Sequence, residues 1–141
     1  MIAPPTVTYP LDPETFEVLT QALEQHAAHR EQQIHEPLLA PTAQERMRLF
    51  HEVACTDQLR CTVEDARSAG QVSLPLDPVT FEVLSTALSS YHDDQRQEAA
   101  EATPRRADLH DGGRARGAAA LADRLHLQAL EAAYFPLRPS T

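Results

Sequence analysis

Residues 7–23 read VTYPLDPETFEVLTQAL, and residues 72–88 read VSLPLDPVTFEVLSTAL. The two stretches agree at twelve of seventeen positions and lie 65 residues apart in a chain of 141 residues. A chain of this length holds two such units and a short tail. Repetition at a fixed offset indicates a duplicated structural unit, so each copy can be interpreted against the other.

Each copy begins with a short extended segment that leads into a helix. Apolar residues alternate with Thr, Ser and Pro over residues 7–11 and 72–76, which is typical of a strand. The prolines lack a backbone N–H, so these are at most short edge segments, and they can face each other about a twofold pseudo-axis. Asp12 and Asp77 then supply N-caps, each followed by a proline at the first helical position.

Apolar spacing and stop signals predict four helices. They cover residues 13–35, 42–70, 78–102 and 113–135, and the Pro and Gly residues of 103–113 predict a loop. Thr42 and Glu45 form a capping box at the start of the second helix. One helical hairpin cannot cover its own apolar stripe, but two can. We therefore expect an all-α fold, a four-helix bundle-like arrangement of two tandem αα-hairpin repeats (7–70 and 72–136) in a single domain of residues 1–141.

The apolar stripes predict which face of each helix is buried. Phe16 and Phe81 follow the two Asp-Pro caps at equivalent positions, and we expect both to be buried. For the second helix we expect the stripe of Met47, Phe50, Ala54 and Cys61 to face the core, widened by Leu49, Val53, Leu59 and Val63. The remaining stripes are Leu19, Leu23, Ala27 and Ile34, then Leu84, Leu88 and Tyr91, and finally Ala118, Leu121, Leu125, Ala129 and Ala132.

The charge of the chain is acidic and unevenly distributed. The net charge is -9. Residues 1–103 carry 17 acids and 6 arginines, and residues 104–141 carry 4 acids and 6 arginines, so the two parts hold about -11 and +2. Because nucleic-acid phosphates repel an acidic body, we do not expect direct nucleic-acid binding.

The expected compartment is the cytoplasm. The N-terminal residues lack a basic region followed by an apolar stretch, so a secretory signal is not expected, and no apolar run is long enough for a membrane span. Cys55 and Cys61 lie six residues apart on one predicted helix, on different sides of its axis. That geometry disfavours a disulfide between them, and free thiols fit a reducing compartment.

Catalytic and metal-binding patterns are absent from the sequence. There is no phosphate-binding glycine loop and no G-x-S-x-G nucleophile elbow. The histidines do not form the Glu-x-x-His pairs of a diiron bundle, although His26 and His29 share a face and His51 lies one turn from Cys55. We therefore expect no catalytic residues, no cofactor and no metal ligands.

The string LDPxTFEVL, preceded by an alternating stretch, resembles the strand-to-helix step of ribbon–helix–helix antitoxins and repressors. It covers about 15 residues of each copy. The resemblance implies pairing of one strand from each copy. That family contacts DNA through basic or polar strand residues, whereas this strand offers Thr6, Thr8 and Pro10. The same string is similar to the start of hydantoinase B-type large subunits, which are far longer chains, and nothing follows from it here.

These observations favour a non-enzymatic helical accessory protein that binds another protein, either a second copy or a different subunit. The alternative is an acidic nucleic-acid mimic or antitoxin-like regulator, and a metal-binding helical bundle comes third. The candidate partner surface consists of apolar residues near the C-terminus and arginines around the predicted loop. These are Tyr134, Phe135 and Leu137, with Arg105, Arg106, Arg114 and Arg116.

Overall fold

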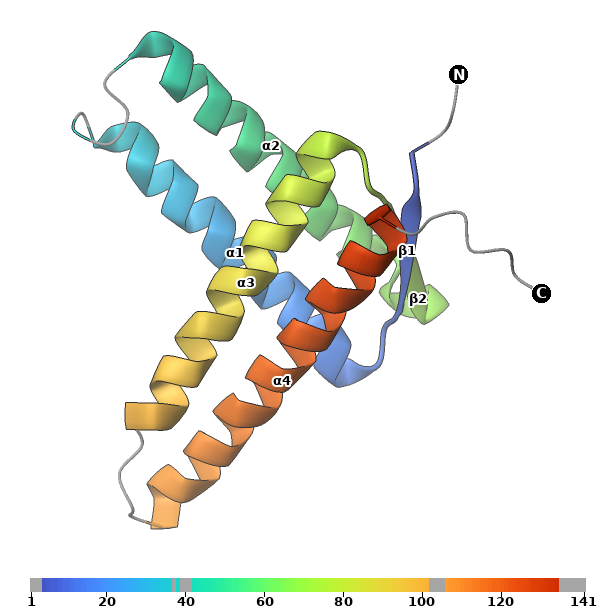
Figure 1. Ribbon diagram of the computed structural model, residues 1–141, viewed down its shortest axis with the longest axis vertical. Coiled ribbons are helices and arrows are strands. Elements are labelled where there is room, and N and C mark those ends of the chain that lie inside the picture. Colours follow the sequence, from blue (N-terminus) through green and yellow to red (C-terminus); the bar gives the residue numbers. More distant parts are fainter. Residues whose placement is uncertain (1–3, 37, 39–41, 102–105, 135–141) are drawn as a thin grey trace.

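The computed structural model describes residues 4–36, 38, 42–101 and 106–134. Four helices and two short strands account for nearly all of this part of the chain (Figure 1). In chain order they are β1 (Thr6–Pro10), α1 (Pro13–His35), α2 (Ala43–Asp65), the short 3-10 helix η1 (Arg67–Ala69), β2 (Gln71–Pro75), α3 (Pro78–Glu101) and α4 (Arg106–Tyr134). The fold is therefore all-α and bundle-like, built from two helical hairpins, as the repeat predicts.

The two repeats begin their helices in the same way. The Asp12 carboxylate accepts a hydrogen bond from the Thr15 backbone N–H at 2.7 Å, and Asp77 accepts one from Thr80 at 2.8 Å. Each bond satisfies a backbone donor that the first turn of a helix leaves free. The backbone hydrogen bond to Asp12 also holds the pKa of that carboxyl below its usual range. Both expected N-caps are confirmed.

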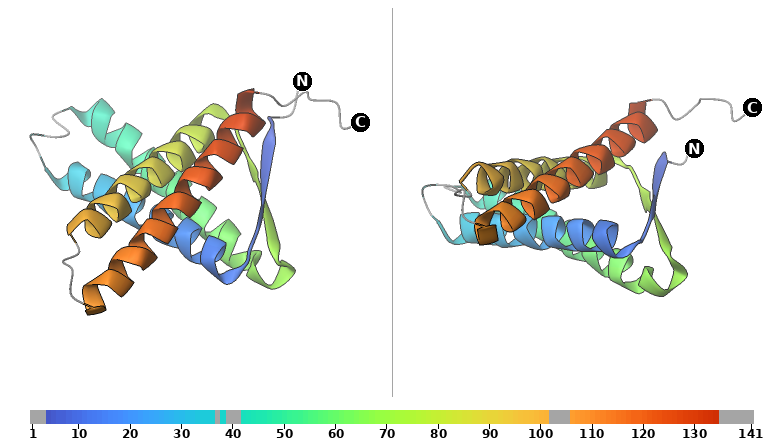
Figure 2. Two further views of the ribbon diagram at one scale, coloured as in Figure 1. Left: turned by 60° about the horizontal axis from the view of Figure 1, so that its bottom comes forward. Right: turned by 90° about the horizontal axis from the view of Figure 1, so that it is seen from below.

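The two lead-in segments pair as an antiparallel ribbon. Val7 pairs with Leu74 and Tyr9 with Val72, which places Thr8 opposite Ser73 at the centre. Thr8 and Ser73 are equivalent residues, 65 positions apart, and their hydroxyl oxygens lie 2.8 Å from each other. A twofold pseudo-axis therefore passes between them. The ribbon lies at one end of the molecule, and both helical hairpins extend away from it and diverge (Figures 1 and 2).

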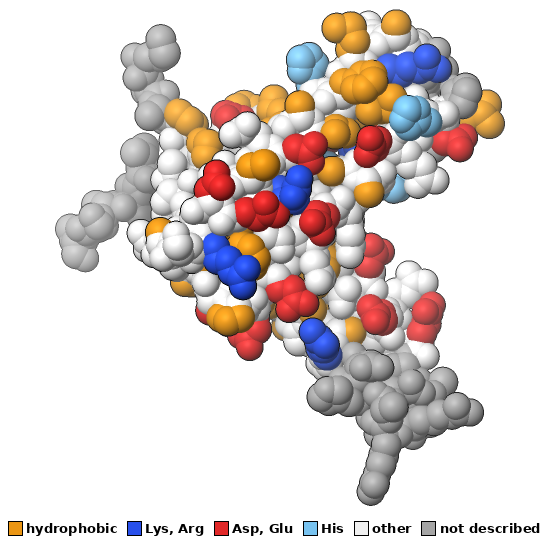
Figure 3. All heavy atoms as spheres, turned by 180° about the vertical axis from the view of Figure 1, so that it is seen from behind, with side chains coloured by type: hydrophobic (Ala, Val, Ile, Leu, Met, Phe, Trp, Pro, Cys, Tyr) orange, Lys and Arg blue, Asp and Glu red, His pale blue; other side chains and the backbone are white. Residues whose placement is uncertain are grey.

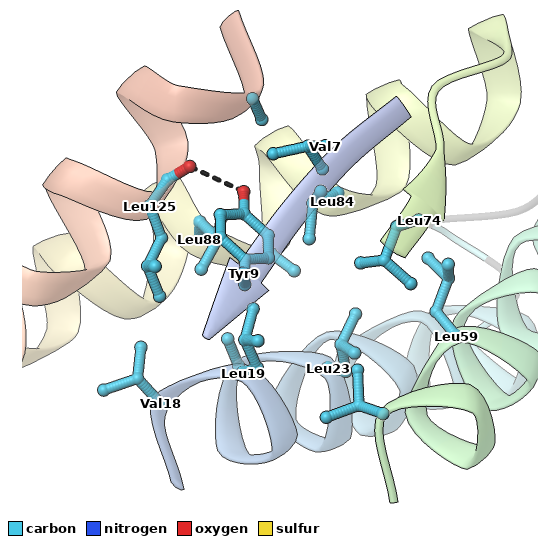
Figure 4. Packing of buried hydrophobic residues seen from close by; sticks show 14 of the residues in the cluster. Val7, Tyr9, Val18, Leu19, Leu23, Leu59, Leu74, Leu84, Leu88 and Leu125 are labelled. Atoms are coloured by element: carbon cyan, nitrogen blue, oxygen red, sulfur yellow. Dashed lines mark hydrogen bonds between the residues drawn. The ribbon is translucent and has the colours of Figure 1, made fainter. Parts of the chain in front are cut away.

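Each strand packs against the second helix of the other repeat. β1 contacts α4, and β2 contacts α2. Tyr9 on β1 is fully buried, and its hydroxyl donates a 2.6 Å hydrogen bond to the Leu125 carbonyl of α4 (Figure 4). One continuous hydrophobic core thus draws on both repeats, including Leu19, Leu84 and Leu125.

Phe16 and Phe81 do occupy equivalent sites, but the expectation that both are buried is wrong. Both are half-exposed and pack on the edge of the core. The guanidinium of Arg67 lies 4.5 Å above the Phe16 ring, while the Tyr134 ring meets Phe81 edge-on at 5.9 Å between centroids. The deepest sites of each repeat belong instead to Val18, Leu19 and Leu23, and to Val83, Leu84 and Leu88.

The predicted start of the fourth helix is also wrong. α4 begins at Arg106 rather than near Gly113, so it includes the glycines that indicated a loop. A glycine costs about 1 kcal/mol in a helix interior, which long flanking helical segments can offset. In the part of the chain that the structure describes, no helix is long and apolar enough to cross a membrane.

Candidate protein-interaction surface

Helix α2 carries apolar residues on two opposite faces, and only one of them is buried. Leu49, Leu59 and Val63 face the interior together with Thr56. The stripe expected to face the core, Met47, Phe50, Ala54 and Cys61, is exposed instead, so that prediction is wrong. The spacing of 47, 50 and 54 is a genuine helical stripe, but it lies on the side turned away from the core.

The outer face of α2, defined here as Met47, Phe50 and Ala54, presents large apolar side chains to solvent. Met47 is 61% exposed and Phe50 is 58% exposed. Leu38, in the connection between α1 and α2, is also exposed. Figure 3 shows hydrophobic side chains gathered at this end of the molecule, with Arg and His side chains beside them. Apolar residues grouped in this way, within a polar surround, are typical of an interaction site.

A buried polar cluster joins α1 to the inner side of α2. The Glu52 carboxylate lies 3.6 Å from Nε2 of His26, 3.4 Å from Nε of Arg30 and 3.7 Å from Nη1 of Arg48. His26 and Glu52 are both buried. Because a buried charge is costly without partners, the cluster favours one alignment of the two helices. It therefore helps to set how the outer face of α2 is presented.

The same cluster shifts the titration of its histidine. Burial lowers the pKa of His26 below its ordinary value, and the nearby Arg30 guanidinium lowers it further. The Glu52 carboxylate opposes both effects, but the net direction is downward. His26 is thus neutral at neutral pH and polar rather than charged within the cluster.

A groove of about 900 Å³ lies between α1, α3 and α4. Arg114 of α4 lies 3.6 Å from Glu17 of α1, and the Tyr91 hydroxyl of α3 donates to Gln21 of α1 at 3.1 Å. These contacts connect the second hairpin to the first across the groove. Its walls carry carboxylates and arginines together, so it does not select a ligand of one charge.

The residues expected to form the partner surface are only partly described. Tyr134 ends α4 and is 68% exposed, while its edge contacts Phe81. Arg114 and Arg116 are exposed on α4, and Arg114 reaches Glu17. Arg106 is the first residue of α4, but its side chain lies outside the described atoms, and Arg105, Phe135 and Leu137 lie outside the described residues. Tyr134 is at the ribbon end of the molecule and the outer face of α2 is on the other hairpin, so the structure does not join them into one surface (Figure 1).

The side chains that carry nucleophilic or metal chemistry are dispersed. Cys55 and Cys61 are both free, as their spacing predicts. Burial raises the pKa of the Cys55 thiol, whose sulfur lies 3.9 Å from the Thr80 hydroxyl, so the thiolate is disfavoured at neutral pH. Among the described residues, no three His, Cys, Asp or Glu side chains are close enough to hold one metal ion.

Comparisons of this chain with protein-family models, with curated proteins and with solved structures find no match.

The outer face of α2 was missed because periodicity alone does not say which of two stripes is covered. A signal was nevertheless present in the sequence. Residues 47 to 63 contain more apolar positions than one helix face can hold, since Met47 and Phe50 lie nearly opposite Leu49 and Val63. A helix that is apolar on two sides either lies inside a protein or contacts a second partner.

Proposed function

We propose that this chain is a non-enzymatic helical protein that acts by binding another protein. The outer face of α2 carries this proposal, because Met47 and Phe50 are mostly exposed on a helix whose opposite face is already buried. Removing such side chains from water contributes about 25 cal/mol per Å² of apolar area, and aromatic anchors often dominate binding. Two free thiols also fit the reducing cytoplasm as its compartment.

The test compares variants in a pull-down from native lysate. The double variant Met47→Asp with Phe50→Asp should lose the proteins that the full chain captures, because two charges replace the apolar anchors. Leu127→Asp is the matched control, since Leu127 is an exposed apolar residue (53%) on α4, away from α2. Identical captured proteins from all three chains, or catalysis by the isolated chain, would contradict the proposal.

A second candidate function is an antitoxin-like regulator. The observation that favours it is the antiparallel ribbon, followed in each repeat by two helices. The exposed ribbon side chains include Thr6, Thr8, Gln71 and Ser73, none of them charged. Such a regulator would therefore act by binding a protein, or by imitating nucleic acid with its acidic body, rather than by contacting DNA phosphates. Gel-shift assays at low salt distinguish these modes, and metal analysis of the purified protein tests the third candidate, a metal-binding bundle.

A further inference from the structure

We infer that the outer face of α2 receives an amphipathic helix of a different protein, one that places acidic residues beside its apolar stripe. The inference rests on the proposed function and adds the chemistry of the partner. It follows from the shape of the apolar stripe and from the charges around it.

The stripe has the geometry of a helix-packing seam. Met47, Phe50 and Ala54 are spaced by three and four residues, which brings them onto one line along the helix. The line continues outward to Ala43, which is exposed, and ends at the charged Asp57. A partner helix can therefore cover about three turns of α2, with one aromatic residue near the middle.

The charges beside the stripe are the reverse of those on the rest of the chain. Arg46, Arg48 and His51 lie within one turn of Phe50, and Glu45 is the one exposed acid in that segment. Arg48 remains 65% exposed at the side chain although it lies 3.7 Å from Glu52. The whole chain carries -9, so this face is a locally basic region on an acidic molecule. Such a region attracts a helix with glutamates or aspartates at its flanks.

A second copy of the chain is disfavoured by the same charges. A symmetric dimer brings one patch against itself, so a twofold axis near Phe50 would gather two copies of Arg46 and Arg48. Like charges across an interface oppose association, and two bodies of -9 repel each other at long range as well. The occupant that the charges favour is thus a different chain.

The experiment uses the full chain and three fluorescent synthetic helices of about 21 residues. The first has leucines on its seam with glutamate flanks, the second has the same leucines with lysine flanks, and the third has glutamate flanks with serines on the seam. Fluorescence anisotropy should show binding of the first peptide, with the second and third at least tenfold weaker. Phe50→Asp should weaken the first peptide at least tenfold and Arg48→Gln severalfold, while Leu127→Asp should leave it unchanged. Circular dichroism confirms that each variant is folded.

Several results would overturn the inference. Equal or tighter binding of the lysine-flanked peptide would show that acidic flanks are not selected, and no peptide binding would exclude a helical partner of this kind. Two results would identify another occupant: a dimer in light scattering that Phe50→Asp dissociates, or cosedimentation with phosphatidylglycerol vesicles that requires Phe50. These outcomes leave room for the proposed function, which fails separately if the Met47 and Phe50 substitutions leave the lysate pull-down unchanged.

Discussion

The Tyr9 hydroxyl is the polar group that reaches deepest into the contact between the repeats. Its hydrogen bond to the Leu125 carbonyl is 2.6 Å long, and burial raises the pKa of the phenol well above its usual range. Tyr9→Phe should therefore lower the free energy of unfolding by about 1 kcal/mol. Tyr91→Phe is the matched control, with an expected loss of about half that value, because Gln21 can bind water instead. Urea denaturation measures both, and equal losses would contradict the ranking.

The paired phenylalanines differ in what covers them. Phe16 lies beneath the Arg67 guanidinium, and Phe81 meets the Tyr134 ring. Because both are half-exposed, Phe16→Ala and Phe81→Ala should each cost about 2 kcal/mol, below the range of about 3–5 kcal/mol for a fully buried Phe. Leu19→Ala and Leu84→Ala, at fully buried equivalent sites, should cost about 3 kcal/mol or more. A larger loss from the phenylalanines in chemical denaturation would show that they are core residues after all.

At the scale of the element, the first hairpin should weaken in mild acid. The unfolded chain protonates His26 near pH 6.5, whereas the folded chain protonates it only at lower pH, since burial and Arg30 disfavour its charged form. Below pH 6.5 the unfolded state therefore binds more protons, and the free energy of unfolding falls with the pH.

Urea denaturation at pH 7.5 and 5.5 tests this pH dependence. His26→Gln should lose less stability between the two pH values than the unmodified chain, because it has no proton to gain. His29→Gln is the control, since it removes an exposed histidine of α1 and keeps His26 in place. The same loss in all three chains would contradict a role for His26.

The elements whose limits could be predicted are those with local chemical signals. The Asp12 and Asp77 caps fixed the starts of α1 and α3, and Thr42 fixed the start of α2. The start of α4 could not be predicted, because Gly112 and Gly113 mark a loop by composition while the helix passes through them. The candidate surface on α2 was missed for a different reason. Burial of Leu49 rather than Phe50 depends on where α1 and α3 lie, which no local pattern contains.

At the scale of the whole molecule, neither repeat completes its core alone. β1 packs on α4 and β2 packs on α2, so each half lacks a layer that the other supplies. Separate chains of residues 1–70 and 71–141 should each show reduced helix content, and mixing them should restore it. Circular dichroism at 222 nm, a signal of helix, measures the change. Full helix content in either half alone would show that a single repeat folds independently.

The C-terminal residues give a second prediction about the whole molecule. Tyr134 contacts Phe81 yet stays mostly exposed, so residues 134–141 can either contact another chain or cover the end of the bundle. We expect contact with another chain, and deletion of these residues should then reduce the mass measured by light scattering. If the full chain is already a monomer in isolation, the self-associating version is wrong, and contact with a different subunit remains.

The hydroxyl pair of Thr8 and Ser73 marks the point where a dimer became one polypeptide. In a pair of separate chains, dilution would dissociate the two halves, and every substitution would appear on both sides. A covalent tether removes the first constraint by mass action and the second by genetics. His26, in its cluster with Glu52, corresponds to Tyr91 in the second repeat, 65 residues on. One half has thus acquired chemistry that the other lacks, on a scaffold that keeps both in register.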